Sequence, residues 1–176
     1  MEGIWKQSVV PGTEHLFVSN LGRVRFPNGQ IKLGTRYYSK NTKSYYQRVC
    51  QTIDGTQAQF PVHRLVCFAF HGDSHRIWLD SVDHINQKSS DNRASNLRFT
   101  TNQLNQYNTS KSLGYTSRGK KFRAQIRYNG KLTTKTFKTA PEARAWYLMK
   151  RAECVQKALD ELAELEKLYE SYCSMD

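Results

Sequence analysis

Residues that can hold a metal ion and move a proton lie close together in the middle of the chain. Asp83 and His84 are adjacent, and Asn105 follows 22 positions after Asp83. A carboxylate and an amide oxygen are hard ligands that suit Mg²⁺. A neutral histidine beside them can act as a general base. Hydrolysis of a phosphodiester needs those parts, a base that activates water and a cation on the scissile phosphate.

Two short strands and a helix are expected to position these residues. The sequence predicts a strand at residues 82–85, a polar loop at 86–95, a second strand at 97–99, and a helix capped by Thr100 or Thr101. Neighbours on a strand point to opposite sides, so Asp83 and His84 meet one substrate only at a twist or a strand end. Asn102 is a rival to Asn105 as a ligand, because it lies about one helical turn earlier.

Several short motifs follow one another along this stretch. They are Val62-His63-Arg64-Leu65-Val66, Val82-Asp83-His84-Ile85-Asn86, Asp91-Asn92-Arg93 and Asn96-Leu97-Arg98, followed by Asn105 and Asn108. Together they resemble the HNH endonuclease family, in the branch from bacteriophage genomes and mobile introns where Asn replaces the final His. The resemblance covers about residues 60–110.

The resemblance implies a ββα-metal fold and a set of roles. Asp83 and Asn105 would bind the metal, His84 would activate water, and Asn96 would have a positioning role near the catalytic loop. The implied cofactor is Mg²⁺, Mn²⁺ or another divalent cation, and the implied products carry 5′-phosphate and 3′-hydroxyl ends.

Other residues of this stretch have alternatives that the sequence leaves open. A helix is predicted from Val62 to about Phe70, and we interpret His63 on it as a packed histidine in preference to a second base. Asn92 is expected to help shape the loop. Arg93 and Arg98 either hold phosphates or solvate the surface.

The flanking segments carry resemblances of their own. Trp5-Lys6 and the run Phe17-Val18-Ser19-Asn20-Leu21-Gly22-Arg23-Val24-Arg25 are similar to the NUMOD4 motif, which often precedes phage HNH domains. Residues 114 to about 147 resemble the AP2 DNA-binding domain, a three-stranded sheet with a packed helix. The residues themselves predict a hairpin at 122–137 with an Asn129-Gly130 turn, and a helix from a Thr139–Glu142 capping box towards Tyr172.

The charge distribution indicates a polyanionic partner. The chain carries a formal net charge of +12, and residues 110–151 hold twelve basic residues against one acidic residue. These bases alternate with aromatic and polar residues and form no amphipathic helix, which favours nucleic acid over a membrane surface. We expect phosphate or base contacts from a set of polar and basic residues: Arg23, Arg25, Arg93, Arg98, Lys120, Lys121, Arg123, Gln125, Arg127 and Lys135.

Composition and patterning predict an α+β protein built from small modules. Hydrophobic residues make up 38% of the chain, which favours several small sheets and helices over one large core. The expected modules are a β-rich segment at 1–60, a ββα-metal HNH core at 61–110, and a three-stranded sheet with a long helix at 111–176. The four scattered cysteines and the N-terminal sequence predict reduced thiols and no secretory signal, so we expect a cytoplasmic protein, in a bacterial host if phage-encoded.

The sequence therefore predicts a metal-dependent DNA endonuclease of site-specific homing type, which makes a nick or a double-strand break. Its partner would be double-stranded DNA, with no membrane, no small-molecule cofactor, and a monomeric or weakly dimeric state. The alternative is a DNA-binding regulator with an inactive HNH centre. An RNA-binding module is less well supported, because the aromatic-rich sheet motifs of common RNA readers are absent.

Overall fold

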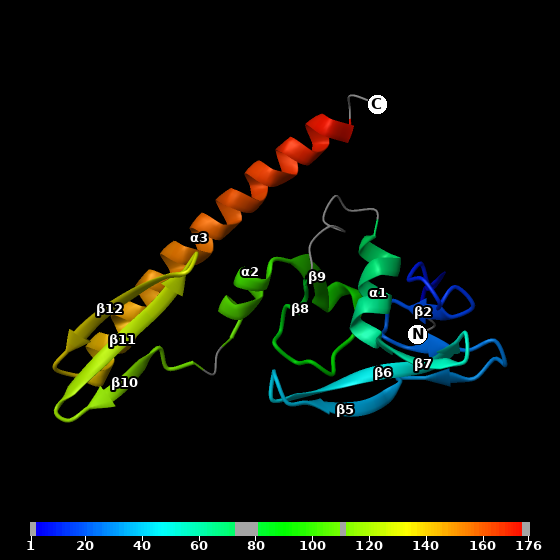
Figure 1. The fold of residues 1–176 in the computed structure, drawn as a ribbon, viewed down its shortest axis with the longest axis horizontal. Helices are drawn as coiled ribbons and strands as arrows, with labels where there is room; N and C mark the ends of the chain where they lie inside the picture. Colours follow the sequence, from blue (N-terminus) through cyan, green and yellow to red (C-terminus); the bar gives the residue numbers. More distant parts are fainter. Residues whose placement is uncertain (1–2, 73–80, 110–111, 174–176) are drawn as a thin grey trace. The chain divides into compact units, whose positions relative to one another are not determined.

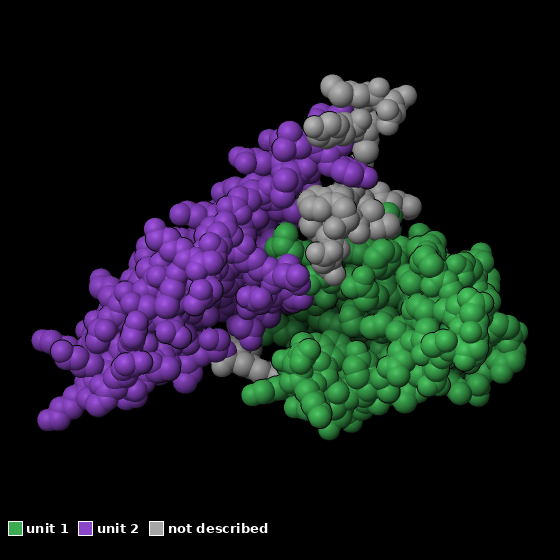
Figure 2. Space-filling view, in the orientation of Figure 1, with its two compact units in different colours: residues 1–101 green, residues 102–176 purple. Residues whose placement is uncertain are grey.

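The computed structural model describes residues 3–72, 81–109 and 112–173. The chain forms two compact units, residues 1–101 and 102–176 (Figure 2). Four small sheets and three α-helices make up the described parts (Figure 1), so the predicted α+β class is confirmed. None of the described helices is long and apolar enough to cross a membrane.

The first unit begins with a four-stranded antiparallel sheet. Its strands are β1 (Trp5–Gln7), β2 (Phe17–Ser19), β3 (Val24–Arg25) and β4 (Ile31–Lys32), in that order. Leu16, Val18 and Val24 are fully buried and form its core side. Gly22 closes the β2–β3 turn at φ +81°, a left-handed conformation that glycine adopts without steric cost. A turn that includes Asn28 and Gly29 joins β3 to β4.

A second antiparallel sheet and a helix follow. The strands are β5 (Thr35–Ser39), β6 (Ser44–Ile53) and β7 (Thr56–Pro61), and α1 (Val62–His71) follows β7 directly. Asp54 and Gly55 both have positive φ, as a two-residue hairpin turn requires. The predicted helix at residues 62–70 is confirmed, and its buried side comprises Val62, Leu65, Val66, Cys67 and Ala69.

The last sheet of the first unit carries the Asp-His pair. Strand β8 (Ser81–His84) pairs antiparallel with β9 (Leu97–Thr100), with Asp83 opposite Arg98 and His84 opposite Leu97. A short 3₁₀ helix, η1 (Ala94–Asn96), leads into β9. Residues 85–93 connect β8 to η1, and we refer to them as the site loop.

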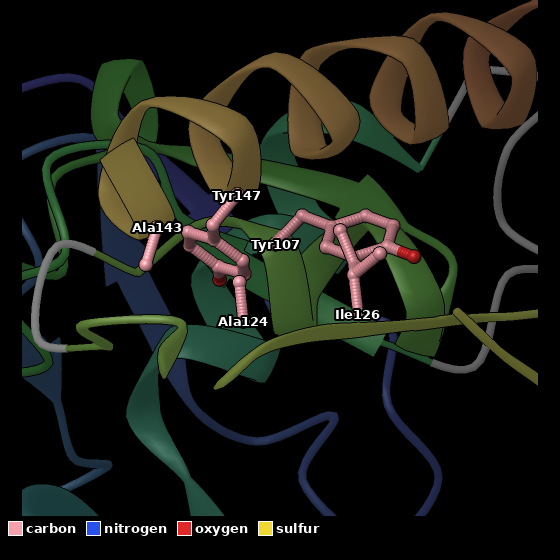
Figure 3. Packing of buried hydrophobic residues seen from close by; sticks show 5 residues of the cluster. All are labelled: Tyr107, Ala124, Ile126, Ala143 and Tyr147. Atoms are coloured by element: carbon pink, nitrogen blue, oxygen red, sulfur yellow. The ribbon is translucent and has the colours of Figure 1, made fainter. Parts of the chain in front are cut away.

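The second unit consists of α2 (Asn102–Tyr107), the sheet β10 (Tyr115–Arg118), β11 (Lys121–Tyr128) and β12 (Lys131–Phe137), and α3 (Ala140–Cys173). Its core is a cluster of buried residues between the sheet and the helices: Tyr107, Ala124, Ile126, Ala143 and Tyr147 (Figure 3). The Tyr107 hydroxyl donates a hydrogen bond to the Arg127 carbonyl oxygen over 2.7 Å. Glu142 and Thr139 exchange backbone-to-side-chain hydrogen bonds, so the predicted capping box is confirmed.

Candidate active site

Asp83 and His84 lie at the end of β8 and are both buried, with 4% and 7% of their surfaces exposed. Their side chains have different neighbours, as the alternation of side chains along a strand requires. Asp83 contacts β9, whereas His84 contacts the site loop and two aromatic rings. The end of β8 therefore places a buried carboxylate and a buried imidazole on neighbouring residues.

Arg98 holds the Asp83 carboxylate. Its Nε and Nη2 atoms donate hydrogen bonds to Asp83 Oδ2 over 3.0 and 2.8 Å. The Arg98 side chain is 45% exposed, whereas the Asp83 side chain beside it is buried. Charge-assisted hydrogen bonds of this kind fix the orientation of a carboxylate. The sequence leaves open whether Arg98 holds a phosphate or is a solvated surface side chain. The structure shows a third arrangement, an ion pair between Arg98 and Asp83.

Asn92 links the His84 ring to β6. The His84 Nε2 atom lies 3.1 Å from Asn92 Oδ1, and Asn92 Nδ2 donates a hydrogen bond to Gln47 Oε1 on β6. These two contacts hold Asn92 between the imidazole ring and β6.

Burial lowers the pKa of His84 below its usual value. The hydrogen bond to Asn92 and the charges of Asp83 and Asp91 oppose that shift without cancelling it. The neutral imidazole is therefore favoured, which is the form that a general base requires.

Asn96 holds the site loop from within. Its Oδ1 accepts a hydrogen bond from the Asn86 backbone N–H over 3.0 Å, and its Nδ2 donates to the Asp91 carbonyl oxygen over 2.8 Å. The Ile85 N–H donates to the Asn96 carbonyl oxygen over 2.9 Å. These contacts give Asn96 a position from which it can shape the loop.

A second ion pair lies within the loop. Arg93 donates from Nε and Nη2 to the two carboxylate oxygens of Asp91, over 2.8 and 2.7 Å. The hydrogen bonds from Arg93, with a further one from Asn86, lower the pKa of Asp91 to about 2 despite partial desolvation. Asp91 is therefore ionised at neutral pH, and Arg93 is engaged within the loop.

The N-terminal sheet supports the site loop. The Ala94 N–H donates to the Asn20 carbonyl oxygen over 2.9 Å. A Cβ atom on Gly22 would lie 2.9 Å from the carbonyl carbon, carbonyl oxygen and Cβ of Asn92, closer than real side chains approach. Gly22 therefore allows the turn before β3 to pack directly against the residue that contacts His84.

His63 on α1 lies beside His84. The centroids of the two imidazole rings are 5.1 Å apart, and the Tyr46 ring lies 5.5 Å from His63 and 6.1 Å from His84. Part of the His63 side chain is exposed, but its Nδ1 is buried without a hydrogen-bond partner among the described residues. Burial, then the charges of His84 and Arg64, lower the pKa of His63 to about 3. His63 is therefore neutral at physiological pH, and its packed role stays an interpretation.

The predicted second ligand lies in the other unit. Asn105 and its rival Asn102 are both on α2, which opens the second unit, whereas Asp83 belongs to the first. Their part in metal binding stays a prediction. Among the described residues, no three His, Cys, Asp or Glu side chains gather closely enough to hold a metal ion. The carboxylate of Asp83 and the amide oxygen of Asn105 or Asn102 fit a divalent cation that prefers oxygen ligands. Such a cation takes part of its coordination shell from substrate phosphates.

The predicted DNA contacts in the first unit have different surroundings. Arg23 is exposed. Arg25 lies over the rings of Trp5 and Phe17, at 5.0 and 4.8 Å from their centroids. Arg25 therefore has a structural role in the first sheet, and Arg23 is the more available of the two.

In the second unit the sheet separates the candidates by face. Lys121, Arg123, Gln125 and Arg127 alternate along β11 with the residues that pack beneath α3, so they lie on the opposite face. Lys120 lies in the turn before β11. Lys135 pairs in register with the buried Ala124, which places it on the α3 side of the sheet. The structure therefore groups four of these six candidates on one face and separates Lys135 from them.

Two contacts of the site were missed from the sequence. Gln47 lies 45 positions before Asn92, and no motif links them. The Asp83–Arg98 pair could have been found from the sequence. Both residues lie on predicted strands, and antiparallel pairing of these two strands brings Asp83 and Arg98 opposite each other.

No protein-family model matches the chain. It is similar, at 33% identity over 98 residues, to a curated protein of Acanthamoeba polyphaga mimivirus named "Uncharacterized HNH endonuclease L247". That similarity covers 56% of this chain, which spans only 24% of the relative's length.

A solved structure on DNA binding and cleavage by the HNH homing endonuclease I-HmuI is similar with a TM-score of 0.42 and 28% identity. The similarity covers 61% of this chain and 57% of that one. Both of these proteins to which the chain is similar are named as HNH endonucleases.

Proposed function

We propose that this protein is a metal-dependent DNA endonuclease that hydrolyses phosphodiester bonds. The observation that carries the proposal is the pair at the end of β8, a buried carboxylate on Asp83 next to an imidazole on His84 whose pKa is lowered by burial. Metal-dependent hydrolysis of a phosphodiester requires a base that activates water and an anionic ligand for the metal, and the two must lie close together. The name of the curated relative is in keeping with this activity.

His84 accepts a proton from the attacking water, while the contact between its Nε2 atom and the Asn92 amide holds the ring in position. Asp83 provides the anionic metal ligand, and the resemblance of residues 60–110 adds Asn105 as a second oxygen donor. When bound, a divalent cation such as Mg²⁺ stabilises charge on the scissile phosphate and the leaving oxygen. Asn96 keeps the site loop in position through its two hydrogen bonds.

DNA is the proposed substrate because of where the positive charge lies. Residues 15–53 contain seven Lys and Arg residues and no acidic residue, and the net charge of the chain is +12. The exposed β11 face adds Lys121, Arg123 and Arg127 with Gln125 between them. Phosphate contacts from such surfaces provide affinity for any DNA sequence. The homing role, the phage origin, and the NUMOD4-like and AP2-like assignments of the flanks belong to the same proposal.

The experiment compares His84→Ala with the native chain on plasmid DNA, with Mg²⁺ or with a chelator. We expect cleavage only with the metal, and a loss of roughly 100-fold or more in His84→Ala with DNA affinity unchanged, as for removal of a general base. His15→Ala is the matched control, because His15 lies outside the site and contacts Gln51. Cleavage by His84→Ala at the native rate would remove His84 from the mechanism. DNA binding without cleavage by the native chain would favour the regulator alternative.

A further inference from the structure

A cationic and aromatic patch lies on one exposed face of the β5–β6 hairpin. The Arg36 Cζ atom lies 3.9 Å from the centroid of the Tyr45 ring, and the Tyr38 ring packs on Tyr45 with its centroid 5.0 Å away. Arg36 is exposed, and both tyrosines are 49% exposed. We propose that this patch, Arg36, Tyr38 and Tyr45, is a DNA-binding surface beside the candidate active site, in which Tyr45 holds the Arg36 guanidinium for contact with a phosphate.

The pairing of the two strands places the patch on one face of the hairpin. Arg36 is opposite Gln47, and Tyr38 is opposite Tyr45, in the antiparallel register. Directly opposite residues point to the same face of a sheet, and so do residues two apart on one strand. The hydroxyl of Ser89, in the site loop, donates a hydrogen bond to the Tyr45 carbonyl oxygen over 2.7 Å. The patch is therefore continuous and borders the site loop.

A short series of contacts connects the patch to His84. Gln47, opposite Arg36, contacts Asn92, and Asn92 contacts the His84 ring. Opposite residues on paired strands are only about 5 Å apart. The series therefore keeps Arg36 closer to His84 than one helical turn of DNA, which is about 34 Å. DNA with its scissile phosphate at His84 can then extend over the patch.

The charge of this part of the chain suits a polyanion. Residues 15–53 contain seven Lys and Arg residues and no acidic residue. No ion pair among the described residues includes Arg36, and its guanidinium lies over an aromatic ring instead. An arginine stacked on a ring keeps the hydrogen-bond donors at the edge of its guanidinium plane. These donors can bind a phosphate, and the ring reduces the entropy that the side chain loses on binding.

Variants of the full chain test the binding surface. Arg36→Gln removes the charge, Tyr45→Leu removes the ring, Tyr45→Phe keeps the ring, and a double variant combines Arg36→Gln with Tyr45→Leu. Lys167→Gln is the matched control, because it removes the same charge from an exposed position on α3. Affinity for a short DNA duplex is measured at several salt concentrations, in chelator so that no metal-dependent cleavage occurs.

We expect Arg36→Gln to bind DNA more weakly and to lower the slope of log K against log salt by about 0.9, the value for one phosphate contact. Tyr45→Leu should bind about 2- to 5-fold more weakly, as for the loss of an exposed cation–π contact, whereas Tyr45→Phe and Lys167→Gln should bind like the native chain. The double variant should lose less than the two single losses combined, because the ring acts through the guanidinium. Equal changes in Arg36→Gln and Lys167→Gln would overturn the proposal, and so would fully additive losses in the double variant.

The location of the contact beside the active site rests on the proposed function. On a duplex that the native chain cuts, neutral methylphosphonate groups are placed one at a time around the cut. They identify the phosphate whose replacement weakens binding of the native chain but not of Arg36→Gln. We expect this phosphate within one helical turn, about 10 base pairs, of the cut, and a more distant phosphate would overturn the proposal.

The two sets of measurements separate this inference from the proposed function. If the native chain binds DNA but cuts none with any divalent cation, the proposed activity fails, and the salt dependence still decides whether Arg36 contacts a phosphate. If the native chain cuts DNA and Arg36→Gln keeps the native slope, the proposed activity stands and the binding surface is refuted.

Discussion

His63 is a titratable residue with a buried ring nitrogen that no described residue satisfies. Its neighbours are the rings of Tyr46 and His84, and its pKa is lowered to about 3. A histidine in the unfolded chain titrates near 6.5, so between these two values the unfolded chain binds more protons than the folded chain. The folded state is therefore destabilised as the pH falls through this window.

We predict that replacing His63 with Phe reduces this acid sensitivity. The ring packing against Tyr46 and His84 is retained, but the titrating group is lost. Linkage limits the contribution of one histidine to about 1.4 kcal/mol of unfolding free energy per pH unit, and we expect less than this limit because His63 is partly exposed. Denaturant titrations at pH 7, 6 and 5 measure the slope, with His15→Phe as the control. Parallel curves for the native chain and His63→Phe would contradict the low pKa.

Single residues in the turns of the first sheet determine how closely its elements approach the site loop. Gly22 and Gly29 both have φ of +81°, but a Cβ on Gly22 would collide with Asn92, whereas a Cβ on Gly29 would have no atom within 4 Å. The two glycines therefore separate the cost of the backbone conformation from the cost of the contact.

We predict that Gly22→Ala lowers the free energy of unfolding by more than Gly29→Ala. Alanine at positive φ costs about 1 kcal/mol at either position. Only Gly22→Ala also displaces Asn92, so only this variant should slow DNA cleavage at unchanged DNA affinity. Denaturant unfolding and single-turnover cleavage measure the two effects. Equal losses of stability and equal cleavage rates in the two variants would show that the contact with Asn92 has no consequence.

Local patterns predicted the elements of this fold well. The hairpin of β11 and β12, the capping box of α3 and the two strands that carry Asp83 and Arg98 all follow from turn residues and side-chain alternation over a few positions. Contacts between distant segments could not be predicted in this way. The Gln47–Asn92 hydrogen bond and the packing of Gly22 on Asn92 depend on how two sheets approach a loop, which no local periodicity encodes.

Across the whole molecule, positive charge is spread over both units, and charge alone does not identify a DNA-binding face. The β11 face that carries Lys121, Arg123 and Arg127 lies opposite α3, whereas other basic residues of the same unit, including Lys135, do not belong to it. A comparison of two variants with equal net charge can separate direct contact between the β11 face and DNA phosphates from the general attraction of a basic protein to DNA.

We predict that Lys121→Gln, Arg123→Gln and Arg127→Gln, combined in one chain, reduce the salt dependence of DNA binding. Each lost phosphate contact lowers the slope of log K against log salt by about 0.9, so three contacts correspond to a decrease of nearly 3. The matched control replaces three basic residues outside that face, Lys138, Lys157 and Lys167, with Gln. Affinities are measured at several salt concentrations. An equal change in both chains would mean that the β11 face makes no direct contact with phosphates.

The packing of Gly22 and Gln47 around Asn92 also bears on protein engineering. A graft of residues 60–110 onto a new scaffold would transfer every residue of the HNH-like motif. It would leave behind the glycine that admits Asn92 and the glutamine that accepts a hydrogen bond from it. The smallest portable version of this site therefore includes both N-terminal sheets, and a designer who recombines such modules at motif boundaries would separate the imidazole from its support.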